Sequence, residues 1–391
     1  MTPWLDIATL KPFLRPHHSE LGVWAEEFAR EHLAPRREPA NDAEARQEAR
    51  QIAATLGEAG WFSWAVPPEH GGRVTAPDLV ACCLLREALA AASPLADAVF
   101  ALQALGSMPI TLGGSSAQQQ RFLPGVVRGS QVAAFAMTEP EAGSDVSSLA
   151  TTATRIEGGY EISGQKTFIS NAGIADFYCV FAQMDPAAGA RGIGAFVVPA
   201  ARAGLRFVRP QLLSSPHPLG ELALEGCRVD SSALIAGPGD GFKLGMRTLD
   251  RLRPTVAAAA CGMAARALDE ALRHARERKQ FGRPLAEHQL VQEKLARMAT
   301  DLTAARLLTY RAAAILDSGA ERATLEAAMA KSFATEAAQR VVDDAVQILG
   351  GRGVMADHPV DRLYRSVRAL RIYEGSTEVQ YLVIARELAR R

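Results

Sequence analysis

The sequence predicts an α+β fold in which a small β-domain separates two helical segments, and three observations lead to this prediction. Apolar residues recur at spacings of three and four up to about residue 131, and again after Gly241. Between these segments Gly, Ser, Thr and Pro become frequent, and the apolar runs shorten to the length of strands. Strands and helices do not alternate along the chain, which excludes a Rossmann fold. We therefore expect an N-terminal helical domain over residues 1–131, a middle β-barrel or β-sandwich domain over 132–238, and a C-terminal four-helix-bundle domain over 239–391.

The first segment has helical spacing in four stretches, with a loop at the prolines and glycines of residues 67–72. Hydrophobic residues make up 48% of the chain, which is ample for a large core. Aromatic residues make up only 6%, so that core must consist mostly of Ala, Leu and Val. The expected helices are Gly22 to Arg37, Ala43 to Ala59, Leu79 to Ala92 and Ala117 to Val127.

The middle segment has the signals of short strands joined by turns. Two β-prone runs flank Gly158 and Gly159, and this arrangement predicts a hairpin. Further strands are expected where apolar runs stand between turn-forming residues. The expected strands are Thr151 to Ile156, Tyr160 to Ile162, Phe177 to Ala182 and Gly194 to Val198.

The last segment returns to helical spacing and keeps it. Long amphipathic helices of this number predict an antiparallel bundle. Pro254 lies inside the first of them and is expected to kink it. The expected helices are Phe242 to Glu277, Glu287 to Ser318, Arg322 to Leu349, Val360 to Arg371 and Ser376 to Arg390.

Composition and charge exclude several classes of function. Lys plus Arg and Asp plus Glu both count 43, and this balance argues against broad electrostatic binding to nucleic acid or to an anionic membrane. The five cysteines form no C-x-x-C pair, and their odd number favours buried, reduced thiols and a cytoplasmic location. The N-terminus resembles neither a signal peptide nor a transit peptide, and we find no uncharged apolar stretch of the roughly 18–20 residues that a membrane span needs. The histidines have no metal-binding spacing, so no metal is expected.

Two segments of the middle domain are candidate ligand sites. In Phe135 to Asp145 an apolar strand runs into small residues and carboxylates, where exposed N–H groups could bind a flat or phosphorylated ligand. Gly164 to Gly173 is typical of a strand that ends at a turn, with Phe168 and Ser170 alternating onto one face. Taken alone, both segments also fit ordinary β-structure.

The C-terminal segment contains two more candidates. Glu277 to Pro284 is a helix end rich in donors, where Arg278 could pair with a phosphate, although basic residues also favour helix C-termini in general. The glycines of Gln347 to Gly353 suit a pyrophosphate or any tight helix-to-loop turn. Glu374 lies just before a helix that Ser376 can cap, so its carboxylate could be a catalytic base. Taken alone, an acid that complements the helix dipole is the better interpretation.

In this order, the segments resemble the acyl-CoA dehydrogenase family over nearly the whole chain, in its short- and medium-chain-like branch. One such match would be weak, but five in register on a helix–sheet–helix frame are highly specific. The landmarks are T-E-P-x-A-G-S-D at Thr138 to Asp145, G-x-K-x-x-I-[ST]-N-[AG]-G at Gly164 to Gly173, R-K-x-F-G at Arg278 to Gly282, Q-[IL]-x-G-G-x-G at Gln347 to Gly353, and I-Y-E-G at Ile372 to Gly375.

The resemblance implies that the cofactor is FAD. Thr138 should then hydrogen-bond the flavin ring, and Phe168 should lie against it. The family is usually a homotetramer, a dimer of dimers, in which the segments at 278–281 and 347–351 reach the FAD of a neighbouring subunit. The cofactor-binding residues that the resemblance implies are Phe135, Met137, Thr138, Gly143, Ser144, Phe168, Ser170, Arg278, Gln280, Phe281, His288, Gln289, Gln347, Gly350, Gly351, Ser376 and Glu378.

Two positions depart from the family pattern. The family often has Thr where this chain has Gln280, whose longer side chain puts the local FAD contact in doubt. It also often has Trp where Phe168 stands, and Phe can still stack but lacks the N–H donor.

The implied reaction is the α,β-dehydrogenation of an acyl-CoA thioester to the trans-2-enoyl-CoA. Glu374 takes the α-proton while the β-hydrogen leaves as hydride to flavin N5, and an electron-transferring flavoprotein reoxidises the flavin. The Glu374 N–H and a ribityl hydroxyl polarise the thioester carbonyl. An apolar pocket should raise the pKa of Glu374 towards the working pH. Some branches place the base where this chain has Leu252, which cannot accept a proton. The implied substrate-binding residues are Ser144, Asp250, Arg253, Tyr373 and Gly375.

Several alternatives stay open. A flavin acyl-CoA oxidase and a dehydrogenase of acyl-carrier-protein thioesters would share the fold, and a non-catalytic, DNA-associated flavoprotein is a more remote possibility. Asp250 and Arg253 could form a mere surface ion pair. The acyl group is also open, and we identify no arginine placed to meet a dicarboxylic one.

Overall fold

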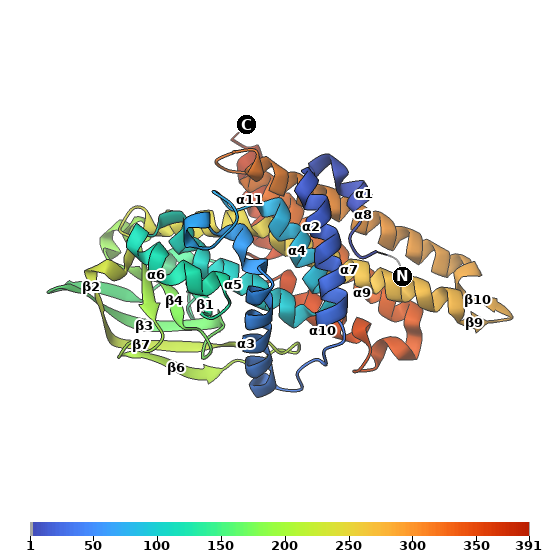
Figure 1. Cartoon of the computed structure of the whole chain (residues 1–391), viewed down its shortest axis with the longest axis horizontal. Helices are drawn as coiled ribbons and strands as arrows, with labels where there is room; N and C mark the ends of the chain where they lie inside the picture. Colours follow the sequence, from blue (N-terminus) through green and yellow to red (C-terminus); the bar gives the residue numbers. More distant parts are fainter. Residues whose placement is uncertain (1–2, 391) are drawn as a thin grey trace. The chain divides into compact units, whose positions relative to one another are not determined.

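The computed structural model describes residues 3–390, and these separate into two compact units (Figure 1). The sheet unit consists of Pro39–Asp78 and Ala98–Leu249. The bundle unit consists of Leu79–Asp97 together with the described residues up to Glu38 and from Asp250 onward. These units do not follow the three-part division expected from the sequence, and the boundaries near residues 131 and 238 stay a prediction.

The sheet unit is built around one eight-stranded sheet, ordered β6-β7-β3-β2-β4-β5-β8, in which β1 pairs with β4 (Figure 1). The expected hairpin is confirmed, because β2 and β3 pair antiparallel with Ile156 opposite Gly159. The two later strands expected from the sequence form β4 and β5. The strands are β1 (Ala133–Ala136), β2 (Thr152–Ile156), β3 (Gly159–Ser170), β4 (Phe177–Gln183), β5 (Ile193–Pro199), β6 (Leu205–Pro210), β7 (Leu219–Asp230) and β8 (Leu234–Ala236).

Strand β4 is buried on both faces, which explains its continuous apolar run. Successive side chains of a strand point to opposite faces. Phe177 and Phe181 accordingly pack into one cluster, which includes residues of helix α6, while Tyr178 and Val180 pack into a second one. Helices contribute to the first cluster, and strands β3, β5 and β7 supply much of the second. The helices of this unit are α3 (Asp42–Glu58), α6 (Ser116–Val127) and most of α5 (Pro94–Gly113).

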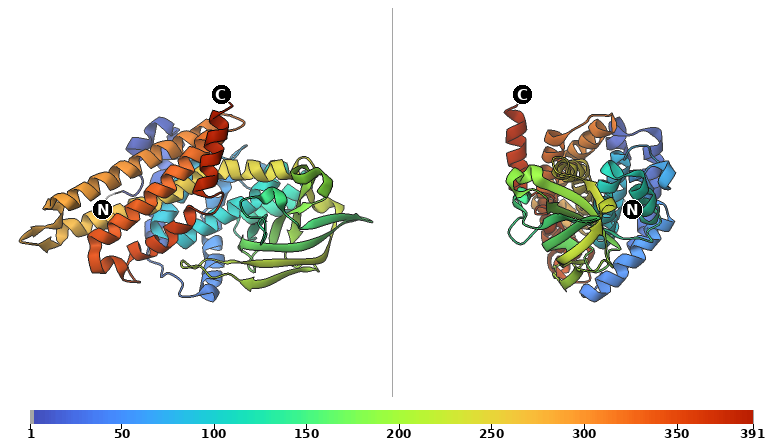
Figure 2. Two further views of the ribbon diagram at one scale, coloured as in Figure 1. Left: turned by 180° about the vertical axis from the view of Figure 1, so that it is seen from behind. Right: turned by 90° about the vertical axis from the view of Figure 1, so that its left-hand side faces the viewer.

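The bundle unit consists of long helices, and α8 and α9 lie side by side over most of their length (Figure 2). A two-stranded connection of β9 (Lys279–Gln280) and β10 (Arg283–Pro284) joins α7 to α8. A π-helical turn at Ala29–Leu33 extends α2. The helices are α1 (Ile7–Leu10), α2 (Pro16–Phe28), α4 (Leu79–Ala92), α7 (Gly241–Glu277), which begins in the sheet unit, α8 (Gln289–Asp317), α9 (Thr324–Leu349), α10 (Pro359–Leu370) and α11 (Thr377–Leu388).

Alanine dominates the core of the bundle, as the low aromatic content predicts. Small side chains let helices approach closely, and the core therefore keeps the dense packing of protein interiors. Helix α7 runs through Pro254 without interruption, and the Thr255 hydroxyl donates to the Leu252 carbonyl at 2.7 Å. All five cysteines are free and buried, as expected. Short 3-10 turns occur at Lys11–Phe13, Trp61–Ala65, Pro68–His70, Val146–Ser148, Pro186–Gly192, Ser231–Ala233, Leu285–Glu287 and Gly350–Val354.

Helix α5 is long and apolar. By length and composition Pro94–Gly113 could cross a membrane, although Asp97 in its first turn means that it is not the uncharged span sought in the sequence. In its most apolar window 61% of the helix is buried inside the protein, as in the core helix of a globular domain. Among the described residues, α5 is the one helix that meets these criteria.

Candidate active site

Glu374 lies in the turn between α10 and α11, where the backbone takes an unusual conformation. Its φ is 53°, in the left-handed region that few residues other than glycine adopt, and Gly375 follows with a φ of 90°. Ser376 caps α11 as predicted, since its hydroxyl accepts a hydrogen bond from the Val379 N–H at 3.4 Å. The helix start is therefore already capped without Glu374.

Side chains from three helices hold this turn in place. Arg253 of α7 donates from Nε to the Glu374 carbonyl at 3.4 Å. Lys331 of α9 donates to the Gly375 carbonyl at 2.7 Å. Gln380 of α11 donates to both carbonyls, at 3.4 and 3.0 Å. Because strained backbone persists only where its surroundings over-determine it, these bonds explain how Glu374 keeps its left-handed conformation.

The Glu374 carboxyl is an unpartnered acid in a buried position. Its Oε2 atom is buried and has no hydrogen-bond partner in the described part of the chain. The Glu374 N–H likewise has no partner among the described residues. Burial raises the pKa of Glu374, against the opposing charges of Arg86, Arg253 and Lys331. A carboxyl with a raised pKa and a free oxygen can accept a proton from a bound molecule.

Asp250 and Arg253 form an ion pair one turn apart on α7. The sequence allowed a mere surface pair, and this alternative is wrong, because the Arg253 side chain is only 9% exposed and that of Asp250 18%. Asp250 also accepts from the Thr324 hydroxyl at 3.0 Å. Leu252, which lies between them in the sequence, is buried at 3% exposure, and its side chain has no oxygen to act as a base.

Sequence analysis missed most of the charged residues around Glu374. Lys331 is fully buried, and burial lowers its pKa to about 8. Arg86 and Asp97 form a second buried pair near the turn. The sequence contained a signal for these residues, since Arg86 and Lys331 are cations within largely apolar helical stretches. Charged residues are rarely buried without a partner, so such positions indicate a contact elsewhere in the fold.

In the sheet unit, Thr138 follows the end of β1 and is fixed by the neighbouring strand. The Thr167 N–H donates to the Thr138 carbonyl at 3.0 Å, while the Thr138 hydroxyl has no partner among the described residues. Met137, the residue before it, is buried. Gly143 and Ser144 further along the loop are exposed, and a Cβ added at Gly143 would meet nothing within 4 Å.

A buried ion pair that sequence analysis did not single out supports this loop. The Lys166 ammonium contacts the Glu139 carboxylate at 2.7 Å, the Met137 carbonyl at 3.1 Å and the Phe181 carbonyl at 2.7 Å. Burial lowers the pKa of Lys166 to about 8, although the Glu139 charge favours the ammonium. Burial alone would raise the pKa of Glu139, but Lys166 and two backbone N–H groups lower it overall. Both members of the pair lie inside motifs quoted above.

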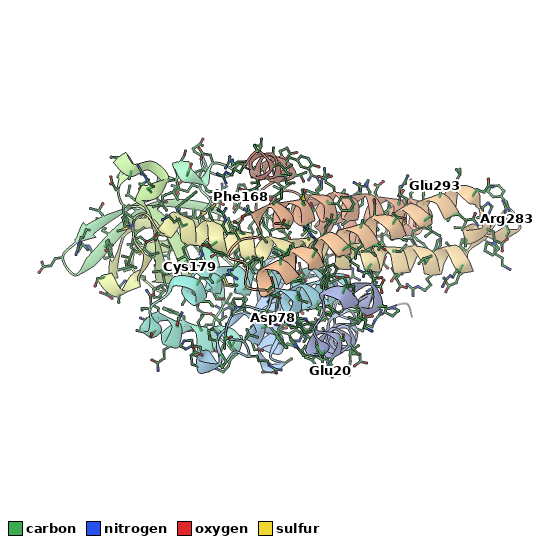
Figure 3. The ribbon with its side chains drawn as sticks, turned by 90° about the horizontal axis from the view of Figure 1, so that it is seen from above. Glu20, Asp78, Phe168, Cys179, Arg283 and Glu293 are labelled. Carbon is green, nitrogen blue, oxygen red and sulfur yellow. The ribbon has the colours of Figure 1, made fainter. Side chains whose placement is uncertain are left out.

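Phe168 and Ser170 do not follow the simple alternation expected from the sequence. The ladder between β3 and β7 is irregular between Lys166 and Ile169, and Phe168 has a φ of 54°. The Phe168 N–H donates to the Gln211 side chain at 2.8 Å, and its ring is 62% exposed on the surface of the sheet unit (Figure 3). Ser170 lies 3.4 Å from Nε2 of His217. The bulge thus presents an aromatic face outward.

These features fit the flavin that the sequence implies. An exposed aromatic ring can stack on a flat heterocycle, and the free Thr138 hydroxyl can hydrogen-bond it. The open space at Gly143 leaves room for a close approach by a ligand. Phe135 differs in being half-buried, with its ring 4.8 Å from that of Phe181, so it packs against strand β4.

The β9–β10 connection, which joins the C-terminus of α7 to the N-terminus of α8, contains or adjoins several predicted residues. Phe281 and Gly282 both have positive φ, as a tight two-residue hairpin turn requires, and Phe281 is 94% exposed. His288 lies 3.2 Å from the Gln280 carbonyl, with its ring 6.1 Å from that of Phe281. Figure 3 shows Arg283 at the tip of this connection. Arg278 and Gln289 are exposed at its two ends.

The turn after α9 is open in the way expected for a ligand-binding backbone. Gly350 ends the helix with a φ of 59°, and added Cβ atoms at Gly350 and Gly351 would meet nothing within 4 Å. Gln347 is exposed in the last turn of the helix. Glu378 is exposed in the first turn of α11, where backbone and Ser376 hydrogen bonds lower its pKa.

Backbone strain coincides with the predicted site residues. In the described chain the non-glycine residues with positive φ are Phe168, Asn171, Phe281 and Glu374. Three of these are predicted site residues, and Asn171 lies next to Ser170. Since such conformations cluster at ligand-binding and catalytic positions, this agreement is independent of the motifs.

Three family models match the chain and together cover most of its length. They are the "Acyl-CoA dehydrogenase, N-terminal domain" over residues 15–130, the "middle domain" over 134–227 and the "C-terminal domain" over 239–389.

Two curated relatives are similar over most of both chains. A 3-(aryl)acrylate reductase of Clostridium sporogenes is 40% identical, with 96% of this chain and 99% of the relative covered. A cyclohexane-1-carbonyl-CoA dehydrogenase of Geobacter metallireducens is 38% identical, with 86% and 89% covered.

Solved structures agree with these relatives. A chain from a structure concerning the electron transferring flavoprotein of Acidaminococcus fermentans matches with a TM-score of 0.90 at 36% identity, covering 97% of this chain and 99% of that one. Butyryl-CoA dehydrogenase of Megasphaera elsdenii matches with a TM-score of 0.89 at 33% identity, covering 96% and 99%. An acyl-CoA dehydrogenase of Bacillus anthracis, solved with FAD, matches with a TM-score of 0.87 at 30% identity, covering 96% and 67%.

The matched segments carry the strained turn of Glu374, the open loop after β1 and the exposed Phe168 in a single chain. Both the cofactor and the class of chemistry follow from the same relatives. The chain therefore belongs to the acyl-CoA dehydrogenase family and is an FAD-dependent oxidoreductase.

Proposed function

We propose that this chain removes two hydrogens across the α,β-bond of an acyl-CoA thioester, giving the trans-2-enoyl-CoA, with Glu374 as the base for the α-proton. The observation that carries the proposal is the buried Oε2 atom of Glu374, which has no hydrogen-bond partner among the described residues. Buried polar atoms are nearly always paired in folded proteins, so an unpaired carboxyl oxygen calls for a ligand. A C–H acid fits this position, since it offers the proton that the oxygen lacks.

The surroundings of Glu374 suit a general base. Burial raises its pKa, which brings the carboxylate closer to the pH at which it must accept a proton. The charges of Arg86, Arg253 and Lys331 oppose this rise and favour the ionised carboxylate. A bound acyl chain would expel more water and raise the basicity further.

The backbone of the same turn can activate the thioester. The Glu374 N–H has no partner among the described residues, so it is available to donate to the thioester carbonyl. That bond strengthens as negative charge develops on the carbonyl oxygen, which makes the α-proton easier to remove. Arg253, Lys331 and Gln380 fix the following carbonyls and so keep the N–H in one orientation. FAD, when bound, supplies the acceptor for the β-hydrogen, which leaves as hydride.

We assign the flavin ring to the loop after β1 and to the bulge at Phe168. The free Thr138 hydroxyl and the exposed ring of Phe168 support this assignment. Gly143 and Ser144 supply open backbone beside them. Met137 is buried and Phe135 half-buried just before Thr138, and Ser170 lies in the same strand end as Phe168.

We assign a second group of residues to the FAD of a neighbouring subunit in a homotetramer. An aromatic side chain that is 94% exposed at a hairpin tip, as Phe281 is, is typical of a contact surface. Arg278 offers a guanidinium for a phosphate, and the open turn at Gly350 and Gly351 offers backbone. Gln280, His288, Gln289, Gln347, Ser376 and Glu378 complete the proposed set.

The proposed thioester contacts are Ser144, Asp250, Arg253, Tyr373 and Gly375. We propose an electron-transferring flavoprotein as the electron acceptor, which is supported by the Acidaminococcus fermentans structure that matches this chain. A cytoplasmic location is proposed from the five free cysteines. Whether the thioester is carried by CoA or by an acyl-carrier protein can be tested by offering both.

A second candidate function is the reverse reaction, reduction of an α,β-unsaturated acyl group that carries an aryl substituent. The observation that favours it is the 40% identity to a 3-(aryl)acrylate reductase over 96% of this chain. In that direction Glu374 would donate the proton to the α-carbon, so the same residue serves both functions. The preferred direction then depends on the substrate and the electron donor.

The test replaces Glu374 and follows the flavin. FAD-loaded Glu374→Gln protein is mixed with saturated acyl-CoA thioesters of straight, branched and ring-bearing acyl groups, and bleaching of the flavin is recorded. Loss of a general base should slow bleaching by about 10²–10⁴-fold. Normal bleaching in this variant would overturn the assignment of the base.

Glu293→Gln is the matched control, because Glu293 is an exposed residue of α8 that pairs only with Arg297 in the described chain. It should bleach at the rate of the unaltered protein. Arylacrylates and their CoA thioesters, offered to the reduced protein, test the reductase function. Oxidation of the flavin by these compounds but no bleaching by any saturated thioester would favour the second candidate.

A further inference from the structure

A buried ion pair that the proposed reaction does not use lies close to Glu374. Arg86 of α4 donates from Nε and one terminal nitrogen to the two carboxylate oxygens of Asp97, at 2.8 and 2.9 Å. Both side chains are only 2% exposed. This two-point arrangement is the strongest geometry available to an arginine and a carboxylate.

The remaining terminal nitrogen of Arg86 is also bound. It donates to the Thr255 hydroxyl at 3.1 Å, two residues after Arg253 on α7. The guanidinium is therefore committed to Asp97 and Thr255.

Asp97 keeps Arg86 from pairing with Glu374. Arg86 is the cation that acts most strongly on the Glu374 carboxyl, yet Oε2 of Glu374 has no partner among the described residues. A buried guanidinium beside a buried carboxylate would ordinarily form a direct ion pair. Here the carboxylate of Asp97 occupies the donors that such a pair would need.

We propose that the Arg86–Asp97 pair is a positioning device: Asp97 holds the guanidinium of Arg86 and so leaves the Glu374 base free of a direct ion pair. The inference rests on the proposed function of Glu374. Arg86 and Asp97 touch neither substrate nor flavin in this proposal, so both are positioning residues. The net charge of the Arg86–Asp97 pair is close to zero as long as both side chains are present.

The remaining charges that face Glu374 come from two further helices. Arg253 of α7 bonds its carbonyl and Lys331 of α9 bonds the next one. Both cations lower the pKa of Glu374, while burial and Asp97 raise it. Removing either member of the buried pair therefore changes this balance in a known direction.

Two single variants should shift the pH profile in opposite directions. In Asp97→Asn the freed guanidinium of Arg86 pairs with Glu374, which lowers the pKa of the base and its rate. In Arg86→Gln a cation is lost, so the pKa of Glu374 rises. The acidic limb of kcat/KM should move to lower pH in the first variant and to higher pH in the second, each by on the order of one unit. The double variant should return the limb towards its original position.

A neighbouring buried pair provides the matched control. Glu87, the next residue of α4, accepts from Arg306 at 2.7 Å and from the Tyr310 hydroxyl at 2.8 Å. Glu87→Gln breaks a comparable buried network on another face of the same helix. It should destabilise the fold without moving the acidic limb.

The measurements are the pH dependence of flavin bleaching with one saturated acyl-CoA, FAD content, and the circular dichroism of each variant. Limbs that stay in place in both folded single variants, or move in the same direction, would overturn the inference. If a single variant does not retain FAD, the folded double variant decides. Flavin bleaching with the acidic limb at its original pH supports the inference. Loss of bleaching at every pH opposes it. The proposed function stands or falls separately, on the bleaching of Glu374→Gln.

Discussion

Replacing Lys166 by Met should both destabilise the sheet unit and weaken its hold on FAD. The ammonium of Lys166 is fully buried and bonds one carboxylate and two backbone carbonyls. Methionine keeps the length of the side chain but donates nothing. The variant therefore leaves the charge of Glu139 with only its two N–H donors, and leaves the carbonyls of Met137 and Phe181 without their partner.

The expected magnitude follows from the burial of the pair. Removing one partner of a buried ion pair commonly costs about 3–5 kcal/mol, which is a large fraction of the roughly 5–15 kcal/mol that stabilises a typical protein. The carbonyl of Met137 also immediately precedes Thr138, the residue proposed to bond the flavin. We therefore expect FAD to bind at least about tenfold more weakly, which corresponds to about 1.4 kcal/mol.

The assay combines urea unfolding of the FAD-loaded protein with titration of the FAD-free protein by FAD. Lys243→Met is the matched control, because Lys243 pairs with Asp240 at 3.2 Å while its side chain is 71% exposed. An exposed pair contributes about 0–1 kcal/mol, so this variant should behave almost like the unaltered protein. A Lys166→Met protein that loses less than about 1 kcal/mol and binds FAD normally would refute the reasoning.

Four further predictions follow from single features. The carboxylate of Asp317 accepts the first two N–H groups of α4 at 2.9 and 2.8 Å, so Asp317→Asn should cost about 0.5–2 kcal/mol of stability in urea unfolding. Phe281→Ser should leave circular dichroism unchanged, since the ring is 94% exposed, but should lower FAD retention and the assembled fraction in size-exclusion chromatography. An acyl thioester ending in a carboxylate should be turned over at least about tenfold more slowly than a neutral one of equal length, because burying a carboxylate is costly and we identify no arginine placed to meet it. Burial, with the charge of a nearby arginine second, lowers the pKa of His217 to about 4, against about 6.5 in the unfolded chain. The unfolded chain thus binds more protons between these values, so stability is lost as the pH falls through this window, and His217→Asn should flatten that part of the curve in unfolding at a series of pH values.

Several elements could be predicted from local patterns to within a few residues, whereas strands β6, β7 and β8 were not predicted. The expected helix at Ala43 to Ala59 is α3, Asp42–Glu58, because its apolar spacing and the Asn41 cap are both local signals. The hairpin at Gly158 and Gly159 was equally visible. For helix α5 a helix was expected around Ala96–Ile110, but its ends at Pro94 and Gly113 were not predicted, and Pro109 lies inside it.

The candidate site could be predicted only in part, because the residues that hold it in place come from distant parts of the sequence. Motifs identified Glu374, Thr138 and Phe168, which lie in short segments with unusual composition. A lone cation in a helix, such as Lys331 or Arg86, gives no local sign of what it contacts. The contact of Lys331 with the turn spans 44 residues, and that of Arg86 with Thr255 spans 169.

For Glu374 the structure argues against one of the two interpretations that the local sequence left open. A glutamate just before a helix ordinarily complements the helix dipole or caps the first N–H groups. Ser376 supplies that cap instead, and the left-handed backbone of Glu374 sets the residue outside the helix. Arg86, the cation with the strongest effect on it, is bound to Asp97. Cap and ion pair are thus both taken by other residues, which supports the proposal that this carboxyl accepts a proton from a bound molecule.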